Sequence, residues 1–210
     1  MQSLIIADIH SSFTPLERVF EYAERSGVKF CFVCGDITHF RSEDIFRFGK
    51  IIEKYRLECY VVHGNCDPPD SLKMFRETDV ELIHCRSVEI GDYTFHGIGG
   101  SNFTPFDTPS EYSEDEFRLF ISRFNYGERN ILVSHCPPHG ILDRTYSGMH
   151  AGCRVLREIM KNFDYIFCGH IHEARGIETS KPVVVNPGAL LSGNFAIWGS
   201  SGIELMRIQF

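Results

Sequence analysis

The sequence predicts an α/β fold in which two mixed sheets are stacked and helices lie outside them. The first half of the chain alternates strand and helix patterns, and the second half contains many more strand patterns than helix patterns. Hydrophobic residues make up 43% of the chain and charged residues 23%, as in ordinary globular proteins. No long linker, low-complexity tract or repeat interrupts the 210 residues, so residues 1–210 are expected to form one domain.

A β-α-β-α-β unit is expected at the start of the chain. Apolar side chains recur with helical spacing between residues 15 and 25, with Thr14 as the N-cap and Gly27 as the stop. The next segment is apolar apart from Lys29, as expected of a buried parallel strand. Such a unit implies a parallel sheet with right-handed crossovers. Its expected elements are, in order, strand Ser3–Ala7, helix Pro15–Arg25, strand Val28–Cys34, helix Glu43–Tyr55 and strand Glu58–Val62.

The second half of the chain is dominated by short runs of strand length. An excess of strands over helices favours two stacked sheets over a single one. The longest irregular stretch, Ser101–Ser110, contains two prolines and no apolar period, and it is either a loop over a site or a plain surface loop. The expected helices are Glu114–Phe124 and Arg154–Phe163, and the expected strands are Val80–Ile83, Ser87–Ile90, Tyr93–Ile98, Ile131–Ser134, Tyr165–Cys168, Pro182–Val185, Phe195–Trp198 and Ile203–Ile208.

Charge and cysteine usage narrow the kinds of partner that we expect. The formal net charge of −7 argues against binding of long nucleic acid, which needs clustered Lys and Arg, but it does not exclude a phosphorylated substrate. No secretory segment precedes the first apolar run, and no apolar stretch approaches the ~20 residues of a membrane span. Several of the eight cysteines lie in strand-like runs as small hydrophobes. We therefore expect a reduced, cytoplasmic protein without a membrane partner.

Polar residues cluster just after the carboxyl ends of five predicted strands. In an open α/β sheet these ends share one edge, which is where ligands bind, so five separate loops should bring the polar side chains together. A glycine precedes Asp36, Asn65 and His170, and glycine permits the tight turns that aim a side chain into a crowded site. The clusters are Asp8 with His10, Gly35-Asp36, Gly64-Asn65-Cys66-Asp67, His135, and Gly169-His170-Ile171-His172.

This set of side chains predicts a centre with two divalent metal ions. Carboxylate, amide and imidazole ligands without thiolate suit Mn, Fe, Zn, Ni or Co, and Mn is the ion that we favour. Seven ligands are too many for one ion, but they fit two ions if one carboxylate bridges them. Two ions ~3.5–4 Å apart can clamp the attacking and leaving oxygens of a displacement at phosphorus.

The ordered motifs resemble those of the calcineurin-like metallophosphoesterases, and the resemblance covers essentially the whole chain. Asn186-Pro187-Gly188 resembles the closing strand and turn of small prokaryotic members, and 135–140 and 169–176 resemble an archaeal and bacterial branch of the phosphodiesterase type. The resemblance implies a four-layer α/β/β/α sandwich. It also implies a first metal held by Asp8, His10, Asp36 and His172 and a second held by Asp36, Asn65, His135 and His170, with Asp36 as the bridge.

The expected reaction is hydrolysis of a small phosphodiester, which could derive from a nucleotide, by attack of a hydroxide that bridges the two metals. Metal binding lowers the pKa of water from about 15.7 toward ~7, so no protein base is needed. Asn65 and His135 would help to stabilise charge on the equatorial oxygens. Alternatives are a phosphomonoesterase or a nuclease on the same centre, or a non-catalytic scaffold of the same fold. The sequence leaves assembly into a homo-oligomer open.

Cys66 departs from the family pattern, because many members have His directly after the metal-binding Asn. A thiol carries no positive charge and donates hydrogen bonds weakly. With Cys66 at this position, we therefore expect the enzyme to prefer esters with acidic leaving groups. His139 could bind substrate or protonate the leaving group, or it could be an ordinary loop residue. Asp67 is not expected to bind metal itself but to stabilise the loop that carries the ligand Asn65. The segment His150–Cys153 is either an ordinary helix start or an anion site.

Overall fold

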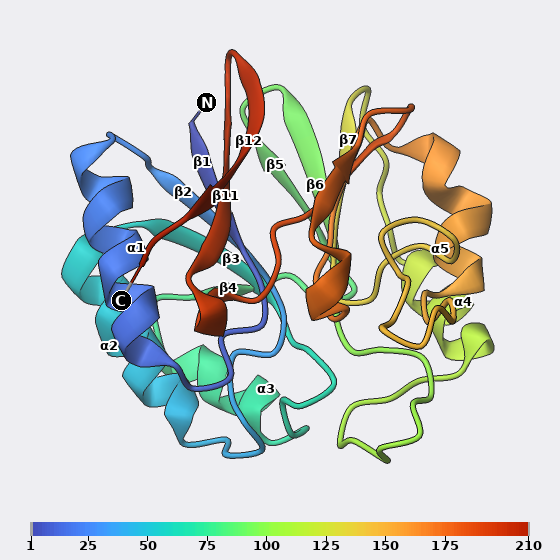
Figure 1. Ribbon diagram of the computed structural model, residues 1–210, viewed down its shortest axis with the longest axis horizontal. Helices are drawn as coiled ribbons and strands as arrows, with labels where there is room; N and C mark the ends of the chain where they lie inside the picture. The colour runs from blue at the N-terminus through green and yellow to red at the C-terminus, as the bar shows by residue number, and fades with distance from the viewer. Residues whose placement is uncertain (1, 210) are drawn as a thin grey trace.

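Two mixed sheets lie face to face at the centre of the computed structural model, which describes residues 2–209 (Figure 1). In the first sheet four parallel strands are extended by an antiparallel hairpin at one edge. The order is β12 (Gly202–Arg207), β11 (Asn194–Gly199), β1 (Ser3–Ile6), β2 (Phe30–Cys34), β3 (Glu58–Val62) and β4 (Glu81–Leu82).

The second sheet also has four parallel strands, here flanked by one antiparallel strand on each edge. Its order is β5 (Ser87–Ile90), β6 (Tyr93–Ile98), β7 (Asn130–Ser134), β8 (Tyr165–Phe167), β10 (Val183–Asn186) and β9 (Gly176–Glu178). The two mixed sheets confirm the fold class that the sequence predicts.

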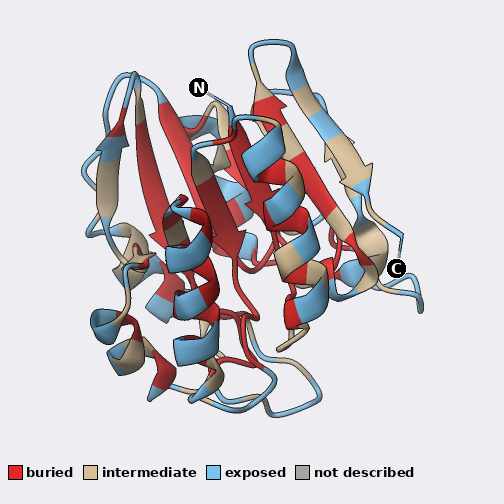
Figure 2. Cartoon of the chain, turned by 90° about the vertical axis from the view of Figure 1, so that its left-hand side faces the viewer, coloured by how far each residue is buried: buried red, intermediate tan, exposed pale blue. Residues whose placement is uncertain are grey.

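Helices cover the outer face of each sheet and complete four layers (Figure 1). The first sheet is covered by α1 (Phe13–Arg25) and α2 (Asp44–Tyr55), and the second by α4 (Glu114–Ile121) and α5 (Arg154–Ile159). Figure 2 shows buried residues along the strands and on the sides of the helices that face them. None of the helices among residues 2–209 has the length and apolar character that crossing a membrane requires.

The space between the sheets is filled by large apolar side chains from both of them. The rings of Phe32 on β2 and Phe95 on β6 stack with their centroids 4.4 Å apart. On β2, Cys34 belongs to this central cluster, whereas Cys31 belongs to the cluster under α1 and α2. Residues three apart on a strand point to opposite faces, so the two thiols are separate hydrophobes. All eight cysteines are free.

The structure corrects several predicted helix ends. Helix α1 begins at Phe13 after Ser12, so Thr14 lies inside the helix and is not its cap. The segment expected to be one helix from Arg154 to Phe163 is α-helical only as far as Ile159 and continues as a 3₁₀ turn. Helix α4 also stops early, although a capping box of Ser113 and Glu116 fixes its start.

The sequence analysis missed a short helix and one strand. The helix α3 (Ser71–Met74) and the edge strand β9 have only four and three residues, too short to show a period.

Candidate metal centre

The seven predicted ligands come from loops that lie side by side at the carboxyl ends of the parallel strands. Backbone hydrogen bonds continue past the ends of the strands and join neighbouring loops to one another. The N–H of Asp8 donates to the carbonyl of Gly35 at 3.1 Å, and the N–H of His10 donates to that of Asp36 at 2.9 Å. Between β7 and β8, the N–H of Gly169 donates to the carbonyl of His135 at 3.0 Å. The positions of the ligands are therefore set by extensions of the sheets rather than by free loops.

Four of the predicted ligands have left-handed backbone conformations. The φ angle is 55° at Asp8, 46° at His10, 52° at Asp36 and 70° at His170. Such angles are uncommon for residues other than glycine, and they gather at functional sites where the surrounding structure enforces them. Here the turns reverse the chain immediately after a strand, so the side chains point back toward the common edge.

Gly64 makes room for the predicted bridging carboxylate. A Cβ atom at this position would lie 2.0 Å from Oδ1 of Asp36, where no side chain can fit. At Gly35, where φ is 81°, a Cβ atom would lie 2.5 Å from Nδ1 of His135. Gly35 thus has the turn conformation that the sequence predicted, whereas Gly64 serves the close packing of the ligand loops, a role that the sequence did not predict.

Asp8, His10 and His172 form one group of potential ligands. One donor atom from each lies within 4.8 Å of the others. The Nε2 atom of His172 is 3.5 Å from Oδ1 of Asp8 and 3.3 Å from Nε2 of His10. These are three of the four residues expected to hold the first metal.

Asp36 lies between this group and a second one. Its Oδ2 atom is 3.5 Å from Nε2 of His10, and its Oδ1 atom is 3.5 Å from Nε2 of His135. Asp8, Asp36 and His135 also lie within 4.8 Å of one another through one donor atom each. The ring of His170 contacts that of His135, with 4.9 Å between centroids. Asp36 is thus the carboxylate with one oxygen toward each group, as its role as a bridge requires.

Hydrogen bonds fix the orientations of His135 and Asn65. Nδ1 of His135 donates to the carbonyl of Cys34 at 2.8 Å, which leaves the lone pair on Nε2. Nδ2 of Asn65 donates to the hydroxyl of Thr108 at 2.9 Å, and this hydroxyl donates to the carboxylate of Glu111 at 2.5 Å. With these assignments, two acceptors, Nε2 of His135 and Oδ1 of Asn65, face each other at 2.8 Å. A pair of acceptors at this separation fits two ligands of one cation.

The electrostatics of the centre also favour cations. Asp8 and Asp36 are almost completely buried, and the basic side chains they contact are the imidazoles of His10, His135 and His172. Burial raises the pKa of Asp36, and His135 offsets this only partly. Burial also acts to raise the pKa of Asp8, but the hydrogen bond and charge of His172 outweigh it and lower the pKa to about 2. The residues present therefore fit a pair of divalent cations, which would replace protons as the counter-charge.

Cys66 lies at the centre and orients the predicted bridge through its backbone. Its N–H donates to Oδ1 of Asp36 at 2.8 Å, and its sulfur lies within 4.8 Å of donor atoms of His10 and Asp36. Burial raises the pKa of the Cys66 thiol, so the thiol stays protonated at neutral pH. A protonated thiol beside Asp36 is a poor proton donor and a poor metal ligand.

Asp67 supports the ligand loops as expected. Its buried carboxylate accepts hydrogen bonds from the backbone N–H groups of Ile37 at 3.1 Å, Thr38 at 2.7 Å and Gly64 at 2.7 Å. It therefore ties the loop after β2 to the loop after β3. Burial, with repulsion from Asp36, raises the pKa of Asp67 to about 6.

The loop 101–110 packs against the same centre. The N–H of Ser110 donates to the carbonyl of Asn65 at 3.1 Å, and its hydroxyl donates to the carbonyl of Asp67 at 2.6 Å. Of the two interpretations that the sequence allowed, the loop beside a site is correct. The contact from Thr108 to Asn65 was missed, although the spacing Thr-x-x-Glu from Thr108 to Glu111 signals a local hydrogen-bonded turn.

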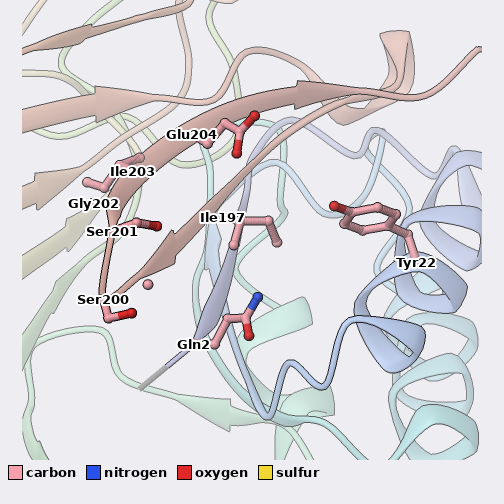
Figure 3. Close-up of a pocket in the computed structure, with 9 residues that line it drawn as sticks. Gln2, Tyr22, Ile197, Ser200, Ser201, Gly202, Ile203 and Glu204 are labelled. Carbon is pink, nitrogen blue, oxygen red and sulfur yellow. The ribbon is translucent and has the colours of Figure 1, made fainter.

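A cavity of about 570 Å³ lies beside the centre and shares His170 and His172 with it. Exposed apolar side chains from the 101–110 loop and from the segment before α5 form much of its wall. Another hollow, of about 550 Å³, lies at the opposite end of β1, between Gln2, Tyr22 and the β11–β12 hairpin (Figure 3). Two of the predicted ligands, His170 and His172, line the first cavity, and none of the seven lines the second.

His139 does not join the centre in the structure. It is absent from the residues that line the cavity beside His170 and His172, and its Nδ1 atom is 3.7 Å from Oδ2 of Asp143. Its predicted catalytic role therefore gains no support from the geometry. Asp143 and His150, which the sequence analysis did not connect, form a much closer pair at 2.6 Å.

The chain belongs to the calcineurin-like phosphoesterases, because the family model of that description matches residues 1–174. Members of this family are metal-dependent hydrolases of phosphoesters. An uncharacterised protein of Methanocaldococcus jannaschii is 34% identical over 199 residues, which cover 89% of this chain and 88% of that protein.

Solved structures share the same fold at low sequence identity. A protein of Thermus thermophilus aligns with a TM-score of 0.80 at 17% identity over 99% of both chains. An archaeal phosphodiesterase aligns with a TM-score of 0.55 at 18% identity, over 99% of this chain and 100% of that one. These structures agree with the layered architecture described above.

Acidification should destabilise the metal-free protein below about pH 6.5. Burial lowers the pKa of His10 from 6.5 to about 4 and that of His170 to about 3. The unfolded chain therefore binds protons on these residues between pH 6.5 and 4 while the folded chain does not. The free energy of unfolding should fall by about 1.4 kcal/mol per pH unit for each such histidine. Urea unfolding at pH 7, 6 and 5 measures this loss.

The variant His170→Gln provides the control for this prediction. It removes one of the titrating groups, so its free energy of unfolding should depend less steeply on pH than that of the unaltered chain. Equal slopes in the two metal-free proteins would show that His170 is not held neutral by the fold.

Proposed function

We propose that the protein hydrolyses a small phosphodiester that carries a flat aromatic group, with two divalent cations, Mn²⁺ foremost, at the candidate centre. The observation that carries this proposal is the cavity that continues from His170 and His172. It offers space for an ester substituent next to a phosphoryl group held at the centre.

The charge of the cavity favours a diester over a monoester. Of the described residues that line it, none is Lys or Arg, and Glu173 is acidic. A phosphodiester carries one negative charge, whereas a phosphomonoester carries about 1.5 to 2 at neutral pH. A monoester dianion would have to be neutralised by the cations alone.

The apolar wall of the cavity favours an aromatic substituent. Phe103, Phe106, Tyr146 and Met149 are 70%, 79%, 92% and 67% exposed, so these side chains are not engaged in the core. A flat ring such as a nucleobase gains about 1–3 kcal/mol by stacking on an aromatic side chain. This supports a nucleotide-derived diester, which is one of the substrates that the sequence allows.

The chain's own residues would orient the reaction. When bound, the two cations would supply positive charge for the phosphoryl oxygens and would lower the pKa of the attacking water. Asp36 holds one oxygen toward each ligand group, and the hydrogen bond to Cys34 keeps the Nε2 atom of His135 directed at the centre. The network from Glu111 through Thr108 holds the oxygen of Asn65 beside it. Such fixed groups need little reorganisation during the reaction.

Hydrolysis of bis(4-nitrophenyl) phosphate and of 4-nitrophenyl phosphate with Mn²⁺ tests the proposal. We expect kcat/KM to be about tenfold or more higher for the diester, which corresponds to about 1.4 kcal/mol. The variant Phe106→Ala should raise KM for the diester because it removes one stacking surface. Phe46→Ala is the matched control, since Phe46 is an exposed aromatic side chain on α2 outside the cavity.

Two results would contradict the proposal. Faster turnover of the monoester would assign the centre to phosphomonoester hydrolysis. Two bound metals without turnover of either ester would favour a non-catalytic scaffold.

A further inference from the structure

A buried carboxylate lies behind the wall of the cavity. Asp143 is 1% exposed, and its Oδ2 atom accepts hydrogen bonds from the N–H groups of Gly140 at 2.8 Å and Gly152 at 3.0 Å. Its Oδ1 atom pairs with Nδ1 of His150 at 2.6 Å. The short distance and the carboxylate partner assign the proton to Nδ1, so Nε2 is the free nitrogen of this ring.

His150 is one of the residues that line the cavity beside two predicted metal ligands. Its side chain is 37% exposed and lines the cavity together with His170 and His172. Within residues 2–209, Nε2 of His150 has no hydrogen-bond partner. A histidine held at one nitrogen by a buried carboxylate and open at the other is arranged for proton transfer.

Backbone hydrogen bonds hold the loop in place on both sides of His150. The N–H of Thr145 donates to the carbonyl of Met149 at 2.9 Å, and the N–H of Ala151 donates to the carbonyl of Asp143 at 3.0 Å. These bonds fix the backbone around His150 independently of its own side chain. The imidazole is therefore not needed to close the loop.

We propose that His150, oriented by Asp143, donates the proton to the leaving group, and that the cavity binds this leaving group. The proposal rests on the phosphodiesterase function proposed above. His150 acts in its imidazolium form, with the Nδ1 proton held by Asp143 and a second proton on Nε2. When the bond from phosphorus to the leaving oxygen breaks, its electron pair stays on that oxygen, which takes the Nε2 proton and leaves His150 neutral. A water oxygen forms the new bond to phosphorus and releases a proton to solvent, and His150 regains one from solvent. Asp143 stays ionised and stabilises the imidazolium.

This assignment supplies a function that Cys66 cannot perform. The protonated thiol of Cys66 is a weak donor, whereas a general acid of matched pKa accelerates such steps by about 10²- to 10⁴-fold. His139 is the other histidine near Asp143, but it lies outside the lining of the cavity. The titratable and charged groups around His150 include Asp143 and His139 on its own side and His170, His172 and Glu173 across the cavity. Arg144 pairs with His150 in an isolated β-bridge, and Arg175 lines another hollow together with both of them.

A series of aryl methyl phosphates that differ only in the leaving phenol tests the proposal on the Mn²⁺-loaded protein. 4-Nitrophenol is a good leaving group that needs little protonation, and 4-methoxyphenol is a poor one. We expect His150→Gln to lower kcat about 10²-fold or more for the 4-methoxyphenyl ester but less than about threefold for the 4-nitrophenyl ester. The unaltered protein should lose activity on the 4-methoxyphenyl ester at alkaline pH, and His150→Gln should lack this loss.

Asp143→Asn and His139→Gln give the proposal further tests. An amide cannot stabilise the imidazolium, so Asp143→Asn should move the alkaline loss of activity to lower pH. His139→Gln should leave the dependence on the leaving group unchanged. Metal content and the thermal midpoint of each variant verify that it is folded and loaded.

The outcomes separate this inference from the function on which it rests. If His150→Gln lowers kcat by the same factor for every ester of the series, His150 has only a structural role and the inference is overturned. If kcat of the unaltered protein falls steeply as the leaving phenol becomes less acidic, and His150→Gln shows the same fall, the inference is also overturned. That result would support the expected preference for acidic leaving groups. If the metal-loaded protein hydrolyses no ester of the series, the phosphodiesterase function itself is wrong.

Discussion

Asp36→Asn should lose metal from both positions of the centre and lower kcat/KM on the order of 10³-fold or more. The reason is geometric, because Asp36 has one carboxylate oxygen 3.5 Å from His10 and the other 3.5 Å from His135. The Asn oxygen could still accept the hydrogen bond from the N–H of Cys66, but the amide nitrogen cannot bind a cation. Asp8 also lies near both ligand groups, but each of the other predicted ligands lies on one side of the centre, so the loss of one of these should spare one ion.

Metal analysis after gel filtration and ester hydrolysis measure both effects. Asp92→Asn is the matched control, since Asp92 is exposed in the turn before β6, at the end of the sheet away from the ligands. The thermal midpoint of metal-free Asp36→Asn should be no lower than that of the metal-free parent, because burial already disfavours the charged carboxylate. Two bound metals and full activity in Asp36→Asn would refute the ligand assignment.

Removal of metal should abolish hydrolysis and lower the thermal midpoint by about 10 °C or more. Binding to the folded state alone contributes about 2.7 kcal/mol for each ion present at 100 times its Kd, or about 5.4 kcal/mol for two ions. For a chain of this length, 1 kcal/mol shifts the midpoint by about 2–4 °C. The cause is the burial of Asp8 and Asp36, whose carboxylates contact only histidines as basic side chains before cations bind.

Thermal unfolding in EDTA, after dialysis and again after addition of Mn²⁺, measures this shift. Recovery of both midpoint and activity with Mn²⁺, and weaker recovery with Mg²⁺, is the result expected for a centre rich in imidazole. In Asp36→Asn the same treatments should move the midpoint much less. A midpoint that does not change when metal analysis shows complete removal would contradict this prediction, because metal that binds only the folded state must stabilise it.

The elements with a clear period were predictable from the sequence, and so were the residues of the candidate centre. β3, β5 and β6 have the predicted bounds. The ligands were predictable because each directly follows a strand and parallel strands present their carboxyl ends at one edge. The ligand roles themselves stay predictions until metal is measured. Helix ends were less predictable, as at α5, because the side chains beyond Ile159 keep a helical pattern while the backbone tightens.

By itself, the sequence determined the family, the layered sheets and the set of side chains at the common edge, since all three follow from periodicity and from motifs at strand ends. Only the tertiary structure decided which distant residues orient that set. Glu111 and Thr108 reach Asn65, and Asp143 reaches His150, through loops without any apolar period. Such contacts depend on left-handed turns and on packing between separate loops, and neither leaves a repeating pattern in the chain.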